Sequence, residues 1–138
     1  MKNKYLIFFL VLFASTSCQK RDSENEKIYT NVKGNTYVAE SPASWEIGMY
    51  IIYKMDSDST IDIEERMYSA DGDLKNKLKG YFNYSHPTLK LRVQSIPGCE
   101  NCFNYFTANV DDDRKSFRYT IFDLGDLKDK IVEFKLKP

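Results

Sequence analysis

Two cysteines three positions apart, Cys99 and Cys102, are the first residues whose types and spacing could carry chemistry. A C-x-x-C pair can be a redox couple, half of a zinc site, two free thiols or a disulfide that closes a loop. Pro97-Gly98 precedes the pair and an aromatic run follows it, which predicts a turn entering a strand. A redox pair instead usually begins a helix, whose N-terminus activates the thiol. We favour a structural disulfide, and the other three interpretations stay open.

Acidic turns and a single histidine are weaker candidates for chemistry. Residues 56–60 (DSDST) and 109–113 (NVDDD) match the first three ligand positions of a calcium loop, but neither has glycine at the sixth position. We interpret both as hairpin turns, with weak calcium binding as the alternative. The sequence therefore predicts no resident metal and no cofactor.

Catalysis has little support in the sequence. His86 stands beside a proline without an evident serine or cysteine partner, and no Gly-x-Ser-x-Gly motif is present. Glu64 and Glu65 are adjacent, so in a strand they point to opposite faces and cannot act on one bond. We expect a protein that is not an enzyme.

The first 17 residues have the layout of a secretory signal peptide. Two lysines without an acid stand at the start, residues 5–14 (YLIFFLVLFA) are apolar, and small residues precede Cys18. The apolar run is well short of the roughly 20 residues of a lasting membrane-spanning helix.

The motif Ser15-Thr16-Ser17-Cys18 resembles a bacterial lipobox of the looser type found in Bacteroidota lipoproteins. The resemblance implies cleavage before Cys18 and acylation of its thiol, with fatty acids such as palmitate. Two or more acyl chains are enough for stable anchoring to a membrane. It therefore implies an outer-membrane lipoprotein of the cell envelope, either periplasmic or exposed on the surface.

Removal of residues 1–17 leaves 18 basic and 20 acidic side chains, a formal charge of −2. The charges are interspersed along the chain, so we expect no nucleic acid as a partner. Residues 18–33 are mostly polar and cannot bury enough apolar surface to order themselves, which predicts a lipidated tether. Residues 34–138 have the length of one small domain.

The domain has the two-residue alternation of strands with one dry and one wet face, clearest in residues 89–94 and 132–137. Turn residues separate the apolar runs, and one short helical turn is expected near residues 41–45. We predict an all-β antiparallel fold. Its eight strands are expected at residues 34–40, 46–55, 60–68, 78–84, 88–95, 103–110, 116–122 and 130–136.

Three stretches carry a second resemblance: Gly34-Asn35-Thr36-Tyr37, residues 79–84 (KGYFNY) and residues 87–91 (PTLKL). Together with the succession of hairpins, they look like the small lipocalin-like domains common in Bacteroidota lipoproteins. This resemblance implies an up-and-down barrel with one open end.

An eight-stranded barrel is either filled by side chains or holds one small ligand. Ten tyrosines are many for a dry core, because each buried hydroxyl needs a partner. We therefore expect a non-enzymatic binding module that recognises a small molecule or a protein through its open end or an aromatic face. The candidate ligand-binding residues are Tyr37, Trp45, Tyr53, Tyr84, Tyr105 and Tyr119.

Of these residues, Tyr84, Tyr105 and Tyr119 are expected to point into the barrel. The alternative function is a filled-barrel structural or inhibitory lipoprotein that contacts a partner protein through its loops. A redox lipoprotein that uses Cys99 and Cys102 is the third possibility.

Overall fold

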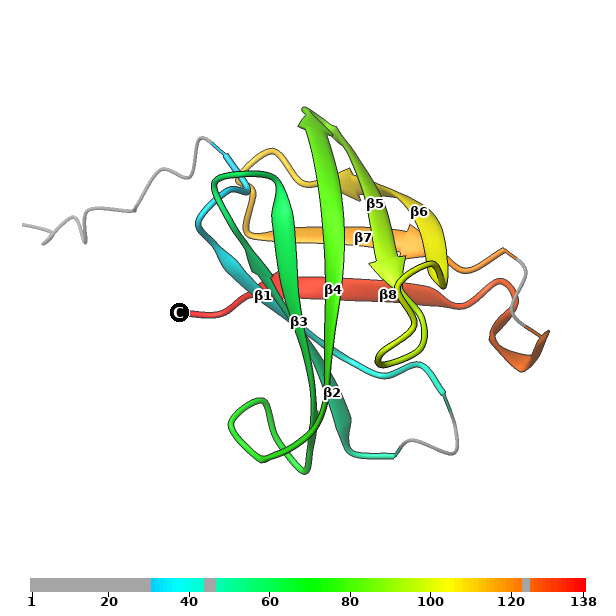
Figure 1. The fold of residues 1–138 in the computed structure, drawn as a ribbon. Helices are drawn as coiled ribbons and strands as arrows, with labels where there is room; N and C mark the ends of the chain where they lie inside the picture. The colour runs from blue at the N-terminus through cyan, green and yellow to red at the C-terminus, as the bar shows by residue number, and fades with distance from the viewer. Residues whose placement is uncertain (1–30, 44–46, 123–124) are drawn as a thin grey trace, which may run out of the picture.

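A computed structural model describes residues 31–43, 47–122 and 125–138. Eight antiparallel strands form a closed barrel in which each strand pairs with its neighbours in sequence and the last returns to the first (Figure 1). The strands are β1 (Thr36–Glu40), β2 (Met49–Met55), β3 (Thr60–Met67), β4 (Asp73–Ser85), β5 (Thr88–Gln94), β6 (Phe103–Val110), β7 (Ser116–Thr120) and β8 (Ile131–Leu136). The predicted all-β, up-and-down barrel is confirmed, and this architecture is compatible with a lipocalin-like fold.

Strand β4 is longer than the predicted 78–84, because it begins at Asp73. The additional residues pair with the end of β3, on both sides of a β-bulge between Glu65 and Arg66. A bulge of this kind bends the strand and increases its twist. The early half of β4 was missed because most of its residues are polar and exposed, so no alternating apolar pattern marks it.

The predicted helical turn near residues 41–45 has no counterpart in residues 41–43, and residues 44 and 45 lie outside the described residues. The backbone N–H of Ser41 instead donates to the carbonyl of Met49 at 2.8 Å, which extends the pairing of β1 with β2. The helix that the described residues do contain is the 3-10 turn η1 (Gly125–Leu127), between β7 and β8.

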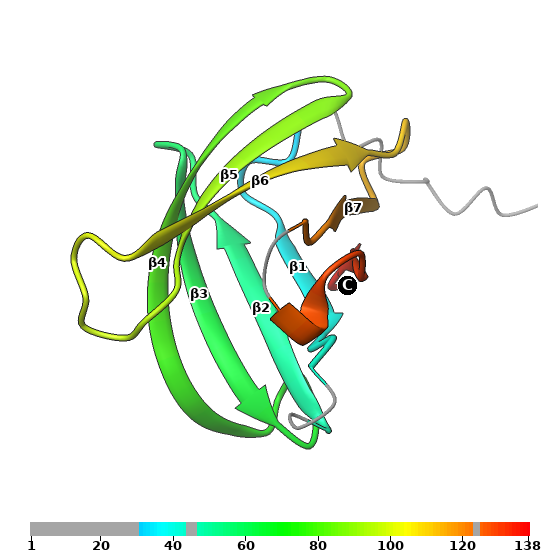
Figure 2. The same ribbon diagram turned by 90° about the vertical axis from the view of Figure 1, so that its right-hand side faces the viewer.

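The two ends of the barrel differ. The turns β2–β3, β4–β5 and β6–β7 lie at one end, together with the start of β1 and the finish of β8, and we call it the closed end (Figure 1). Val32 and Tyr37 are fully buried there, and the Tyr37 hydroxyl donates to the carbonyl of Arg114 at 2.8 Å. The β1–β2, β5–β6 and β7–β8 connections and η1 lie at the opposite end, which we call the mouth (Figure 2).

Stacked aromatic rings fill the part of the barrel interior next to the closed end. Tyr37 meets Phe117 edge-on with ring centroids 5.0 Å apart. Phe134 stacks on Phe117 at 4.9 Å and on Tyr53 at 4.3 Å. Such pairs contribute stability beyond the area that they bury. This part of the interior is therefore packed with side chains.

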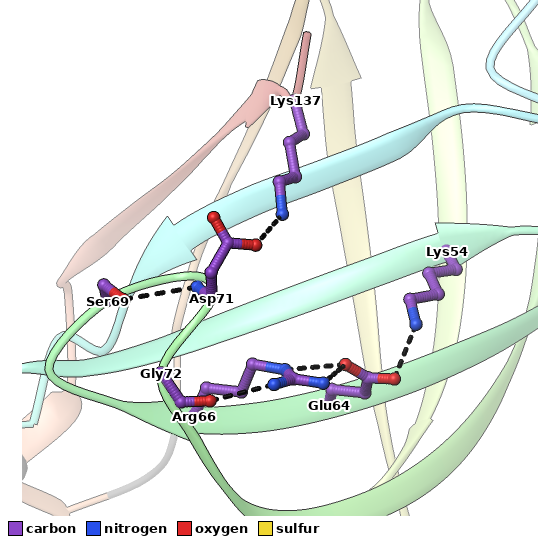
Figure 3. Close-up of polar contacts among 7 residues, drawn as sticks. All are labelled: Lys54, Glu64, Arg66, Ser69, Asp71, Gly72 and Lys137. Carbon is purple, nitrogen blue, oxygen red and sulfur yellow. Dashed lines mark hydrogen bonds and ion pairs between the residues drawn. The ribbon is translucent and has the colours of Figure 1, made fainter.

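The loop between β3 and β4 folds back over the outer wall of the barrel (Figure 3). Arg66 donates to the carbonyl of Gly72 at 2.8 Å and pairs with Glu64 at 2.7 Å. Lys54 approaches the same carboxylate at 2.5 Å. The hydrogen bond from Lys54, aided by Arg66, lowers the pKa of Glu64.

A second contact holds this loop to the end of the chain, because Asp71 forms an ion pair with Lys137 (Figure 3). Ile52 lies beneath these contacts, next to Asp71 and Lys137. Tyr53, the next residue, points into the barrel, so Ile52 points outward, yet its side chain is only 2% exposed. Since successive side chains of a strand point to opposite faces, the loop and its ion pairs shield an apolar side chain on the outer face.

Candidate mouth cavity

A cavity of about 180 Å³ opens at the mouth of the barrel. Its apolar lining comes from strands on every side and from η1, and comprises Ile51, Tyr53, Ile63, Leu78, Val93, Phe106, Tyr119, Ile121, Leu127 and Val132. A dry cavity of roughly 150 Å³ in another protein accommodates benzene. The mouth cavity is therefore large enough for a molecule the size of one ring.

Side chains of a strand alternate between its two faces, and this alternation brings the lining residues to the inner face of the barrel. Ile51 and Tyr53 are two residues apart on β2, and Ile63 and Glu65 are two residues apart on β3, so each pair faces inward. Leu127 of η1 also lines the cavity, and η1 is the short coiled ribbon between β7 and β8 in Figure 2. The short helix is therefore part of the rim.

Two tyrosine hydroxyls meet inside this apolar lining. Tyr53 is 2% exposed and Tyr119 is 6% exposed, and each hydroxyl affects the pKa of the other. Burial raises the pKa of Tyr119 to about 12. Burial, with smaller contributions from Tyr119 and Glu65, raises the pKa of Tyr53 well above its usual value. Both hydroxyls therefore stay protonated at neutral pH. Phe106 stacks on Tyr119 at 4.4 Å.

Glu65 brings a half-buried carboxylate to the same cavity. Asn76, directly opposite on β4, donates to one of its oxygens at 2.6 Å. None of the ion pairs among the described residues includes Glu65. The cavity therefore combines an apolar wall with the polar side chains of Gln94, Ser95 and Asn104 and with the carboxylate of Glu65, which has no cationic partner among the described residues. Glu64 and Glu65 do point to opposite faces, as predicted.

The structure places the predicted ligand-binding tyrosines in different regions. Tyr53 and Tyr119 line the cavity, whereas Tyr37 is buried at the closed end. Trp45 lies outside the described residues, and Ser41 and Pro42, just before it in the chain, contribute to the mouth.

Tyr105 points away from the barrel interior and is 71% exposed, contrary to the expectation that it points inward. Ala108 and Val110 are buried, and two-residue alternation then places Phe106 inside and Tyr105 outside.

Tyr84 belongs to a polar cluster at the closed end that the sequence did not reveal. Its hydroxyl lies 3.0 Å from Nδ1 of His86, and Nε2 of His86 lies 3.1 Å from a carboxylate oxygen of Asp112. Asp112 is 26 residues from His86 in sequence, so only the fold brings them together. The Asp112 side chain is fully exposed, where solvent weakens such a pair. We interpret the cluster as a connection between two turns.

Cys99 and Cys102 lie in the β5–β6 loop at the mouth, with their sulfur atoms at bonding distance and their Cα atoms 5.4 Å apart. Disulfides ordinarily span this Cα separation, so the pair can form one. The side-chain amide of Gln94 donates to the carbonyl of Cys99 at 2.7 Å and holds the loop to β5. Cys18, the predicted lipidation site, lies outside the described residues.

The acidic turns use their carboxylates locally. Asp58 accepts hydrogen bonds from the hydroxyl and the backbone N–H of Thr60, and Asp111 accepts one from Ser116. Within the described ranges, no three His, Cys, Asp or Glu side chains gather closely enough to hold a metal ion. No helix in those ranges has the length and apolar character needed to cross a membrane.

Comparison with known proteins gives no relative for this barrel. No known protein family matches the chain, and neither does any curated protein or solved structure.

Proposed function

We propose that this protein is a lipid-anchored, non-enzymatic binding module that holds one small, largely apolar molecule in the mouth cavity. The observation that carries the proposal is the cavity of about 180 Å³, which joins an apolar and aromatic lining to the carboxylate of Glu65. Ligand sites in proteins commonly combine apolar walls with a few polar groups that orient the ligand. Cys18 supplies the anchor in this proposal, on the strength of the lipobox resemblance.

The lining favours a ligand of the size of one ring that carries an amine or another strong hydrogen-bond donor. Its apolar part displaces water from the side chains of Ile51, Ile63 and Val93. Its donor meets Glu65, which has a hydrogen bond from Asn76 but no cation. The rings of Phe106 and Tyr119 add a favourable environment for a cation.

Three probes of matched size test this proposal: benzylamine, benzyl alcohol and benzoate. We expect benzylamine to bind with roughly millimolar affinity, benzyl alcohol more weakly, and benzoate least, because Glu65 repels a carboxylate. The measurement is a titration of the methyl resonances of Ile51 and Ile63 by NMR. The same probes are added to the Glu65→Gln variant, in which the preference for the amine should disappear.

Ile121→Trp provides the matched control, because it fills the cavity while Glu65 stays in place. Benzylamine and benzyl alcohol should both lose their binding to this variant. If none of the probes shifts the cavity methyl groups, the filled-barrel alternative becomes the better interpretation. In the part of the interior next to the closed end, the packed aromatic rings already favour the filled-barrel alternative.

A further inference from the structure

Four side chains on the outer wall of the barrel, away from the mouth cavity, form a surface that we call the outer platform: Tyr81, Arg92, Phe103 and Tyr105. Tyr81 of β4 is directly opposite Arg92 of β5, and Arg92 is directly opposite Tyr105 of β6. Phe103 lies on the same face of β6, two residues before Tyr105. Tyr81 is 47% exposed and Tyr105 is 71% exposed.

Aromatic rings hold the guanidinium of Arg92 in place. It lies 4.0 Å from the ring centroid of Phe103 and 5.6 Å from that of Tyr81. Cation–π contacts of this kind leave the N–H edge of arginine available for a carboxylate. Among the ion pairs of the described residues, none includes Arg92. The platform thus presents an oriented donor group without a carboxylate partner.

The surroundings of the platform are positively charged. Lys79 precedes Tyr81 on the outer face of β4, and Lys90 precedes Arg92 on that of β5. The strand segments of β5 and β6 contain no acidic residue at all. Asp62 on β3 lies 3.9 Å from Lys79, and both side chains are largely exposed. The charge complementary to this surface is negative.

A shallow depression of about 240 Å³ adjoins the platform and is lined in part by Tyr81, Lys90, Arg92 and Tyr105. Tyrosine, phenylalanine and arginine are the residues enriched in the buried centres of protein–protein interfaces, where they contribute most of the binding energy. Lysines at the edge of such a surface steer an oppositely charged partner toward it.

We infer that the outer platform docks an acidic segment of a partner protein that also carries an aromatic side chain. Carboxylates of the partner bind Arg92 and Lys90, and its aromatic ring packs between Tyr81 and Tyr105. This site is separate from the mouth cavity, so it can operate whether or not that cavity holds a ligand.

A random copolymer of glutamate and tyrosine serves as the probe, with poly-glutamate and dextran sulfate as comparisons. The full chain should bind the copolymer more tightly than poly-glutamate of equal charge, because only the copolymer supplies rings for Tyr81 and Tyr105. Binding should weaken as salt increases. Affinity is measured by fluorescence anisotropy of the labelled polymers.

Matched variants separate the platform from general attraction between charges. Arg92→Gln should weaken copolymer binding about tenfold or more, while Lys128→Gln, which removes one exposed charge elsewhere, should change it by less than about twofold. Tyr105→Ser should weaken it several-fold, while Tyr68→Ser, at another exposed tyrosine, should not. Circular dichroism of each variant confirms that the barrel is intact.

Three results would overturn the inference. Equal losses for Arg92→Gln and Lys128→Gln would mean that only net charge matters. Equal affinity for poly-glutamate and the copolymer would leave the aromatic rings without a role. Tighter binding of dextran sulfate than of the copolymer would assign the surface to an anionic polysaccharide instead of a protein. None of these results bears on the mouth cavity, which is tested with its own probes.

Discussion

Replacement of Tyr119 by phenylalanine should destabilise the barrel at neutral pH, because it removes the hydroxyl that interacts with the buried hydroxyl of Tyr53. A buried polar group that loses its hydrogen bond typically costs about 1–3 kcal/mol of unfolding free energy. Tyr53→Phe should have a similar cost. The double variant removes both hydroxyls together and should lose less than the sum of the two single variants.

The same pair makes stability depend on alkaline pH. Burial raises the pKa of Tyr119 to about 12, whereas an exposed tyrosine of the unfolded chain titrates near ~10. A group whose pKa is raised by folding stabilises the folded state fully below the unfolded pKa, and this stabilisation is lost as the pH rises toward the folded pKa. For Tyr119 the loss amounts to about 3 kcal/mol between about pH 10 and 12. Tyr53, whose pKa is also raised, adds to it.

Urea unfolding, followed by circular dichroism from neutral pH to about pH 12, measures both effects in the wild type, the two single variants and the double variant. The unfolding free energy of Tyr119→Phe should fall less steeply with pH than that of the wild type above about pH 10. Costs that simply add in the double variant would contradict the interaction between the two hydroxyls. Equal pH slopes in all four proteins would contradict the burial of these hydroxyls.

Three further predictions concern glycine and cysteine residues. Gly72→Ala should destabilise the protein more than Gly98→Ala, because a Cβ at Gly72 would lie 1.9 Å from the carbonyl oxygen of Met67. A Cβ at Gly98 meets open space, so only its positive φ opposes the change, at about 1 kcal/mol; thermal unfolding compares them. Serine at both Cys99 and Cys102 should cost about 2 kcal/mol in denaturant unfolding, the entropy of closing a four-residue loop. Cys18→Ser should abolish labelling by radioactive palmitate in growing cells.

Each of these predictions has an outcome that contradicts it. Similar losses in the two glycine variants would mean that the β3–β4 loop does not pack as described. Alkylation of the denatured protein before reduction would show free thiols at Cys99 and Cys102, since a disulfide blocks the reagent and releases two reactive thiols on reduction. Undiminished palmitate labelling of Cys18→Ser would exclude Cys18 as the lipidation site.

Alternation in the sequence was sufficient to locate all eight strands, but not the full extent of β4. The bounds predicted for β6 are those observed, because buried and exposed residues follow each other clearly at its C-terminal half. The early part of β4 escaped prediction because it is held by pairing with β3, while its own residues are mostly polar. Pairing between strands stabilises a segment that has no amphipathic pattern of its own.

The inward or outward direction of aromatic side chains was harder to predict. Phe103, Tyr105 and Phe106 lie in one strand, and aromatic residues suit either face, so Tyr105 was expected inside. Only the burial of Ala108 and Val110 shows which of the alternating side chains of β6 point into the barrel. The row of Tyr81, Arg92 and Tyr105 depends on the register of three strands, which no single segment encodes. The outer platform could therefore be recognised only in the folded chain, whereas Tyr53 and Tyr119 of the mouth cavity were already candidates from the sequence.

Because the number of strands is even, both ends of the described domain lie at the same end of the barrel. Strand β1 begins at the closed end and β8 finishes there, so both ends of the described domain leave from that pole (Figure 1). An attachment through the residues before 31 therefore holds the barrel by its closed end. The mouth, with Glu65 and the β5–β6 loop, then lies at the opposite pole of the barrel from the attachment point.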